Sequence, residues 1–80
     1  MLSAYVLIQF GSLDSADAMA RVHKDLRGVK GVKTVHILAG PTDAIAYVEA
    51  ADQNALMQAI GGIRMTRGVA STDTRIVFPI

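Results

Sequence analysis

The chain has no cysteine among its 80 residues, and it contains only two histidines. The absence of cysteine excludes disulfides, thiolate nucleophiles and zinc sites built on thiolates. His23 and His36 lack the spacing and the companions of a metal site, so we predict no metal and no cofactor. A domain this short is only marginally stable alone, and oligomerisation is the remaining common means of stabilisation.

Long apolar runs are also missing, because no segment approaches the ~20 residues of a membrane-spanning helix. Residues 1–4 lack the charged region of a signal peptide, so we expect a cytoplasmic protein without membrane contact. The net charge is +1, without the basic stripe typical of nucleic-acid binding. Lys24, Arg27, Lys30 and Lys33 do cluster, and we interpret them as a solvated helix end favoured by the helix dipole, with nucleic-acid contact as the alternative.

Hydrophobic residues make up 51% of the chain, and their spacing predicts alternating strands and helices. Strands are expected over residues 2–10, 33–39, 44–50 and 69–78. The first helix is expected to begin at Asp14 or Ser15 and to end at Gly28, with Met19, Val22 and Leu26 facing inward. The second helix is expected to begin at Asp52 or Asn54.

This order is strand-helix-strand repeated twice, and the two halves resemble each other. Ala4-Tyr5-Val6 matches Ala46-Tyr47-Val48, and Gly31-Val32 matches Gly68-Val69. Two such units predict an α+β fold, a ferredoxin-like βαββαβ sandwich with two helices on one face of a four-stranded antiparallel sheet. Right-handed crossovers place the first and third strands in the centre, in a single domain over residues 1–80.

The first predicted strand is apolar at nearly every position, which favours burial on both faces. Two helices cover only one side of a sheet, and Ile45 and Tyr47 of the third strand extend the apolar surface on one side. Exposed apolar surfaces of this width usually mark interfaces, so we predict a dimer formed sheet to sheet. Shielding by helix and loop residues is the alternative.

The loop Gly40-Pro41-Thr42-Asp43 joins two predicted strands and has the composition of a turn. A polar loop with one carboxylate, presented by a rigid sheet, is typical of recognition sites. The alternative is a plain hairpin in which Asp43 serves turn geometry. Thr72 and Thr74 share one face of the last strand and offer paired hydroxyls to a ligand, although threonine is also simply favoured in strands.

Catalytic signals are weak. No serine lies in a glycine-flanked elbow, and the glycines of Gly28-Val29-Lys30-Gly31 and Gly61-Gly62 match no phosphate-binding loop. His36 and Asp43 are the candidates for acid-base chemistry, but His36 is interpreted as a partly exposed structural residue of a strand. We therefore predict no catalytic residues. Gly61-Gly62 either admits a close neighbour or frays the helix.

Several segments together resemble the effector-binding domain of Lrp/AsnC regulators, also called the RAM domain. These segments are residues 40–48, Leu56, residues 60–63 and residues 67–74. The family pattern has Gly-x-aromatic-Asp before the third strand and Gly-Val-x-x-Thr-x-Thr into the fourth. The resemblance implies dimers formed through the sheets, rings of dimers such as octamers, and amino acids bound in clefts between neighbouring dimers.

Carried onto this sequence, the resemblance implies loop contacts from Gly40, Pro41 and Thr42, with Asp43 binding an α-ammonium group. Thr72 and Thr74 match the fourth-strand motif. Thr42 stands where the family has an aromatic residue, which implies a smaller side-chain pocket or a degenerate site.

The function implied is a non-enzymatic, oligomeric amino-acid-binding module that modulates transcription of amino-acid metabolism through partners such as full-length regulators. Met1 directly precedes the first predicted strand, so we expect a stand-alone domain without a helix-turn-helix and without direct DNA binding. One alternative is a small dimeric enzyme of the monooxygenase or isomerase type, which needs an enclosed pocket with a proton-transfer group. The other is a purely structural partner of full-length regulators, favoured if the cleft at Asp43 is collapsed or self-occupied.

Overall fold

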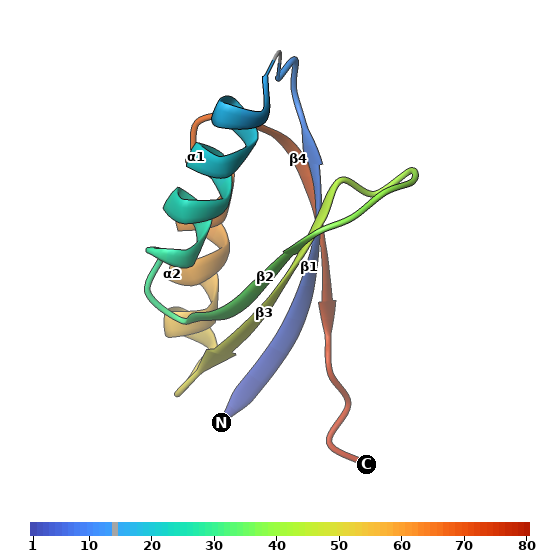
Figure 1. Cartoon of the computed structure of the whole chain (residues 1–80). Helices are drawn as coiled ribbons and strands as arrows, with labels where there is room; N and C mark the ends of the chain where they lie inside the picture. Colours follow the sequence, from blue (N-terminus) through green and yellow to red (C-terminus); the bar gives the residue numbers. More distant parts are fainter. Residues whose placement is uncertain (14) are drawn as a thin grey trace.

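The computed structural model describes residues 1–13 and 15–80. Its six elements are β1 (Leu2–Phe10), α1 (Ala16–Arg27), β2 (Val32–Ile37), β3 (Ala44–Ala50), α2 (Gln53–Arg64) and β4 (Val69–Ile76). The strands form one antiparallel sheet in the order β2-β3-β1-β4, and both helices cover the same face of it (Figure 1). The ferredoxin-like fold is confirmed, with the first and third strands in the centre.

Both helices begin at a capping side chain that accepts a hydrogen bond from a backbone amide. Ser15 accepts from the Ala18 N–H at 3.1 Å, and Asp52 accepts from the Ala55 N–H at 2.9 Å. Each bond satisfies one of the amides left free in the first turn of a helix. Ser15 and Asp52 are thus the caps among the predicted alternatives, and Asp14 lies outside the described residues.

The core lies between the helices and the helix-facing side of the two central strands. It is completed by one residue of β2 and five residues of the helices. Its buried members are Ala4, Val6, Ile8, Val22, Leu26, Val35, Ala44, Ala46, Val48, Ala50, Leu56, Ala59 and Ile63. The expectation that Met19 joins this core is wrong, because its side chain is 38% exposed.

Two strands end earlier than the sequence pattern predicts. β2 ends at Ile37 instead of Ala39, because the Leu38 N–H already bonds the carbonyl of Asp43 at 2.9 Å and closes the hairpin. β4 ends at Ile76, which lies opposite Ala4 of β1, instead of at Phe78. The last bond on this side runs from the Val77 N–H to the Ser3 carbonyl at 2.9 Å.

The sequence repeat corresponds to a structural one. β1 and β3 pair in the register that sets Tyr5 opposite Tyr47, with ring centroids 5.1 Å apart. Gly31 and Gly68 precede β2 and β4, and both adopt positive φ, 98° and 102°, which glycine tolerates best. Each half therefore returns from helix to strand through the same glycine turn.

The second helix approaches its neighbour closely at one of its two adjacent glycines. A Cβ on Gly62 would lie 2.7 Å from Cγ1 of Val29, whereas a Cβ on Gly61 would meet nothing within 4 Å. The expectation of a close neighbour is therefore confirmed for Gly62.

Gly68→Ala is expected to lower the free energy of unfolding by about 3 kcal/mol, combining backbone strain with overpacking. The reason is local, since Gly68 has φ +102° and a Cβ there would lie 2.7 Å from Cγ2 of the buried Val22. Urea denaturation measures the change. Gly61→Ala is the control, and it should be neutral or stabilise by up to about 1 kcal/mol. Equal loss in both variants would contradict this account.

Candidate functional site

The loop between β2 and β3 projects past the sheet on the side opposite the helices (Figure 1). Gly40 has φ +122°, a left-handed conformation that favours glycine at the turn. Gly40 and Pro41 are exposed, whereas Thr42 and Asp43 are half-buried at the point where the chain enters β3. The sheet thus presents these four residues together at one end of the molecule.

Three hydrogen bonds hold this loop against the end of β1. Oδ2 of Asp43 accepts from the Phe10 N–H at 2.9 Å, and the Asp43 N–H donates to the Ile8 carbonyl at 3.0 Å. The side-chain amide of Gln9 donates to the Pro41 carbonyl. The loop is therefore fixed by a strand distant in sequence, and Asp43 has a set orientation.

The carboxylate of Asp43 retains capacity for a further partner. An ionised carboxylate has about four acceptor positions on two oxygens. The Phe10 amide uses Oδ2, and no donor to Oδ1 is present in the described part of the chain. Hydrogen bonds from charged donors are about twice as strong as neutral ones, so Oδ1 suits an ammonium group.

Thr72 and Thr74 lie on the helix-facing side of the edge strand β4. Their register partners on β1 are Ile8 and Val6, both fully buried under the helices. The two threonines therefore share a face, as predicted, and both are half-buried. Thr72 also borders a hollow of about 350 Å³ beside Arg64.

One chain does not bring the loop and the threonines together. β1 lies between β3 and β4, and Ile8 pairs with Ala44 on one side and with Thr72 on the other. Two strand spacings separate Ala44 from Thr72, about 10 Å. Asp43 and the threonines are thus separate groups within a chain.

The face of the sheet opposite the helices, here called the open face, has an apolar centre. Tyr5 and Leu7 of β1 lie beside Tyr47 and Ile45 of β3. Tyr5 is 45% exposed, so the prediction that β1 is buried on both faces is wrong for the single chain. The two helices cover only the other side.

Polar side chains surround this apolar centre and pair with each other. The Tyr47 hydroxyl donates to Glu49 at 3.1 Å. Arg75 and Asp73 form an ion pair at 2.8 Å, and its hydrogen bond lowers the pKa of Asp73 and raises the pKa of Arg75. The rim of the open face therefore remains charged at neutral pH.

The two histidines differ in their contacts and exposure. Nε2 of His23 lies 3.0 Å from the Val35 carbonyl, and His36 is exposed on β2. Outside Asp14, no three His, Asp or Glu residues are placed to hold a metal ion. No helix within residues 1–13 and 15–80 has the length and apolar content needed to cross a membrane.

The model of the family described as the Lrp/AsnC ligand binding domain matches residues 3–79. The chain belongs to this family. The resemblance inferred from the loop and the fourth strand is thereby confirmed, together with the fold that it implied.

Two solved structures are similar to this chain over its whole length. A protein from Thermus thermophilus is 26% identical with a TM-score of 0.81, covering 100% of this chain and 96% of that one. The feast or famine regulatory protein of M. tuberculosis, complexed with L-methionine, is 25% identical with a TM-score of 0.79. That match covers 100% of this chain and 52% of the regulator.

An enzyme also contains a similar segment. A homocitrate synthase of Saccharolobus islandicus is 41% identical over 65 residues, which cover 81% of this chain. The chain spans only 14% of that enzyme's length, so the likeness concerns one segment of it.

The contacts that hold the loop are not evident from the sequence pattern. Gln9 and the amide of Phe10 fix Pro41 and Asp43, yet neither was singled out from the pattern. The available signal was Gln9 itself, a polar residue that interrupts an apolar strand near its end.

Proposed function

We propose that this Lrp/AsnC domain is a non-enzymatic, oligomeric module that binds a free amino acid. Its partners respond to whether the amino-acid site is occupied. The observation that carries the proposal is the Asp43 carboxylate, oriented by the Phe10 amide and open at Oδ1. The mycobacterial relative complexed with L-methionine supports an amino acid as the ligand class.

The proposed site has Gly40, Pro41, Thr42 and Asp43 on one side. Asp43 binds the α-ammonium, and the exposed loop backbone lines the ligand. The ligand's carboxylate needs donors, and Thr72 and Thr74 offer hydroxyls. Because the loop and threonines of one chain are separated by β1, the threonines come from a neighbouring chain. The site is then complete only in an assembly of dimers.

The proposed dimer buries the open face against a second copy. Its centre is apolar, with Tyr5, Leu7, Ile45 and Tyr47, and its rim is polar, as in many protein interfaces. The arrangement leaves the Gly40–Asp43 loop at the edge, where a second dimer contacts it. Rings of dimers such as octamers satisfy both requirements.

The proposed output is regulation of amino-acid metabolism in the cytoplasm through a partner. Full-length Lrp/AsnC regulators are one class of partner, and the described elements all belong to the ligand-binding fold. We therefore expect sequence-specific DNA binding only with a partner that reads DNA. The likeness to a segment of homocitrate synthases favours a biosynthetic enzyme as a second class of partner.

The rival functions are less well supported by the geometry. A small dimeric enzyme needs a proton-transfer group in an enclosed pocket, but neither histidine lines the hollows beside Arg67, Arg64 and Lys30. A purely structural role in co-assembly would also explain the hydrogen bond between Asp43 and Phe10. That role differs from the proposed function because it predicts no amino-acid ligand.

A thermal-shift screen against the twenty amino acids tests the proposed function. A ligand at ~100 times its dissociation constant should stabilise the protein by about 2.7 kcal/mol. The N-acetyl derivative of the best ligand lacks the ammonium and should lose most of the shift. If no amino acid shifts the unfolding temperature at millimolar concentration, the structural role is the better account.

A further inference from the structure

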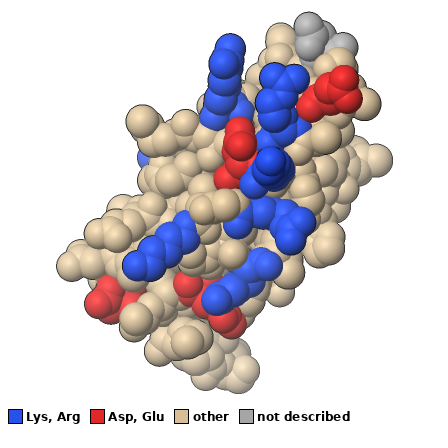
Figure 2. All heavy atoms as spheres, turned by 60° about the vertical axis from the view of Figure 1, so that its left-hand side comes forward, with Lys and Arg blue, Asp and Glu red and all other residues tan. Residues whose placement is uncertain are grey.

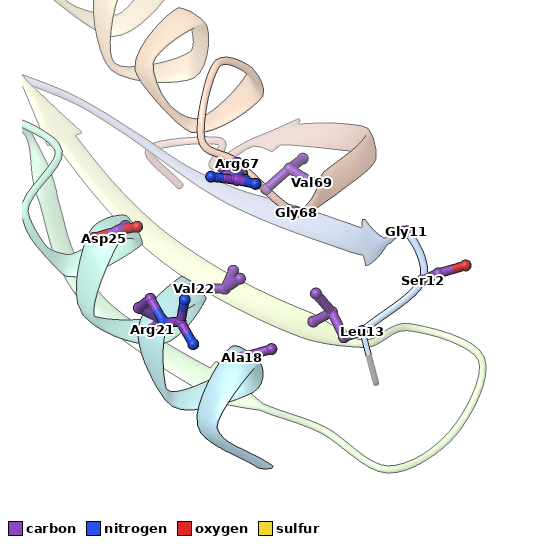
Figure 3. Close-up of a pocket in the computed structure, with 10 residues that line it drawn as sticks. All are labelled: Gly11, Ser12, Leu13, Ala18, Arg21, Val22, Asp25, Arg67, Gly68 and Val69. Atoms are coloured by element: carbon purple, nitrogen blue, oxygen red, sulfur yellow. The ribbon is translucent and has the colours of Figure 1, made fainter. Parts of the chain in front are cut away.

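A hollow other than the one beside Thr72 lies on the helix side of the molecule, away from the Gly40–Asp43 loop (Figure 3). It has a volume of about 350 Å³ and is formed by the β1–α1 turn, α1 and the α2–β4 turn. The residues that line it are Gly11, Ser12, Leu13, Ala18, Arg21, Val22, Asp25, Arg67, Gly68 and Val69. Its size is at the lower end of small-molecule pockets.

The turns that frame this hollow are tied together. The Gly11 N–H donates to the Gly68 carbonyl at 2.8 Å, which joins the end of β1 to the start of β4. Gly68 lies so close to α1 that a Cβ would come within 2.7 Å of Val22 and 3.5 Å of Leu13. The floor is therefore built from fixed backbone and apolar side chains.

Two arginines from different elements border the hollow. In Figure 3, Arg67 extends from the α2–β4 turn and Arg21 from α1, on either side of the floor formed at Val22. Neither forms an ion pair in the part of the chain that the structure describes, where Arg75–Asp73 is the only one. Among the described lining residues Asp25 is the single carboxylate, so the two arginines outnumber it.

Lys and Arg side chains gather along the helix side of the molecule, with Asp and Glu side chains among them (Figure 2). The guanidinium group presents a planar fork of donors that matches carboxylate and phosphate oxygens, and it is more weakly hydrated than an ammonium group. Two such groups at one hollow favour an oxyanion.

The structural repeat provides an internal comparison. A larger hollow, about 610 Å³, lies at the equivalent α1–β2 turn, where Lys30 precedes the positive-φ glycine as Arg67 does here. The helix residue equivalent to Arg21 is the uncharged Gln58. The hollows are thus products of the fold, whereas the pair of guanidinium groups belongs to one of them.

We propose that the hollow between Arg21 and Arg67 binds a small oxyanion, either a short organic acid or a phosphate compound. The guanidinium groups hold the oxyanion, and the apolar floor at Leu13, Val22 and Val69 accepts a short carbon chain. This hollow shares no residue with the proposed amino-acid site, so the oxyanion proposal does not rest on the amino-acid proposal. The hollow lies on the helix side, so a dimer formed through the open face leaves it accessible.

Amide NMR titrations of the full chain with succinate and, separately, inorganic phosphate at constant ionic strength test this proposal. Saturable shifts are expected at the amides of Gly11, Gly68 and Val69. Arg21→Gln and Arg67→Gln should each weaken binding roughly 10-fold or more, the range for losing a charged hydrogen bond. Arg21→Gln also reproduces the residue found in the repeat-related hollow.

Arg27→Gln is the matched control, because Arg27 is exposed on the same helix but does not line the hollow. It should leave both affinities unchanged. A response to only one of the two probes supports the site and identifies the ligand class. The proposal is overturned if neither probe gives saturable shifts, or if Arg27→Gln weakens binding as much as Arg21→Gln.

Discussion

Replacing Asp43 with asparagine is expected to weaken amino-acid binding roughly 30-fold or more while the fold and the oligomer survive. The Phe10 N–H bonds Oδ2 of Asp43 at 2.9 Å, and the carbonyl oxygen of asparagine can accept the same bond. The side-chain amide then occupies the position of Oδ1, where it offers donors instead of a negative charge to the ammonium. Calorimetry on both proteins measures the loss.

Two further variants separate the roles of this side chain. Asp43→Ala removes the Phe10 bond as well, so it should also lower the free energy of unfolding by about 1 kcal/mol. Asp17→Asn makes the same change of charge at an exposed helix position and should leave affinity unaltered. Unchanged affinity in a correctly assembled Asp43→Asn protein would remove Asp43 from the site.

Leu7→Asp is expected to dissociate the proposed dimer into monomers, with a dissociation constant raised by about 1000-fold or more. Leu7 lies at the centre of the open face, between Ile45 and Asp73 in the register. In the proposed dimer the new carboxylate is buried without a partner, and Asp73 repels it. Each dimer contains two copies of this defect, which explains the size of the effect.

Light scattering at micromolar concentration measures the molar mass of each protein in solution. The wild type should run as a dimer or a multiple of one, and Leu7→Asp as a folded monomer. Met57→Asp is the control, because Met57 is 60% exposed on α2, away from the open face. A monomeric wild type, or a Leu7→Asp protein with the wild-type mass, would refute the sheet-to-sheet dimer.

The elements were predictable because their signals are local. Ser15 and Asp52 cap helices through amides three residues away, and the Tyr5–Tyr47 repeat marks the strands that pair at the centre. The ends of β2 and β4 were not predictable, because they depend on which carbonyl each backbone amide bonds in the folded chain. Leu38 finds the carbonyl of Asp43, a contact set by the hairpin and not by the apolar pattern.

The sequence motif names the residues of the proposed site but does not show how they are arranged in space. The loop and the threonines follow from the motif, whereas the bond between Asp43 and Phe10 spans 33 residues and depends on how β1 pairs. The same pairing places β1 between the loop and Thr72. Sequence order contains no record of that separation, which is why the proposed site takes its threonines from a second chain.

A crystal structure with the amino acid selected by the screen tests the central claim most directly. The account predicts that the ligand's ammonium lies within hydrogen-bond distance of Oδ1 of Asp43. It also predicts that the ligand's carboxylate meets Thr72 or Thr74 of a neighbouring chain. A ligand bound in the hollow between Arg21 and Arg67, or anywhere away from the Gly40–Asp43 loop, would contradict the claim.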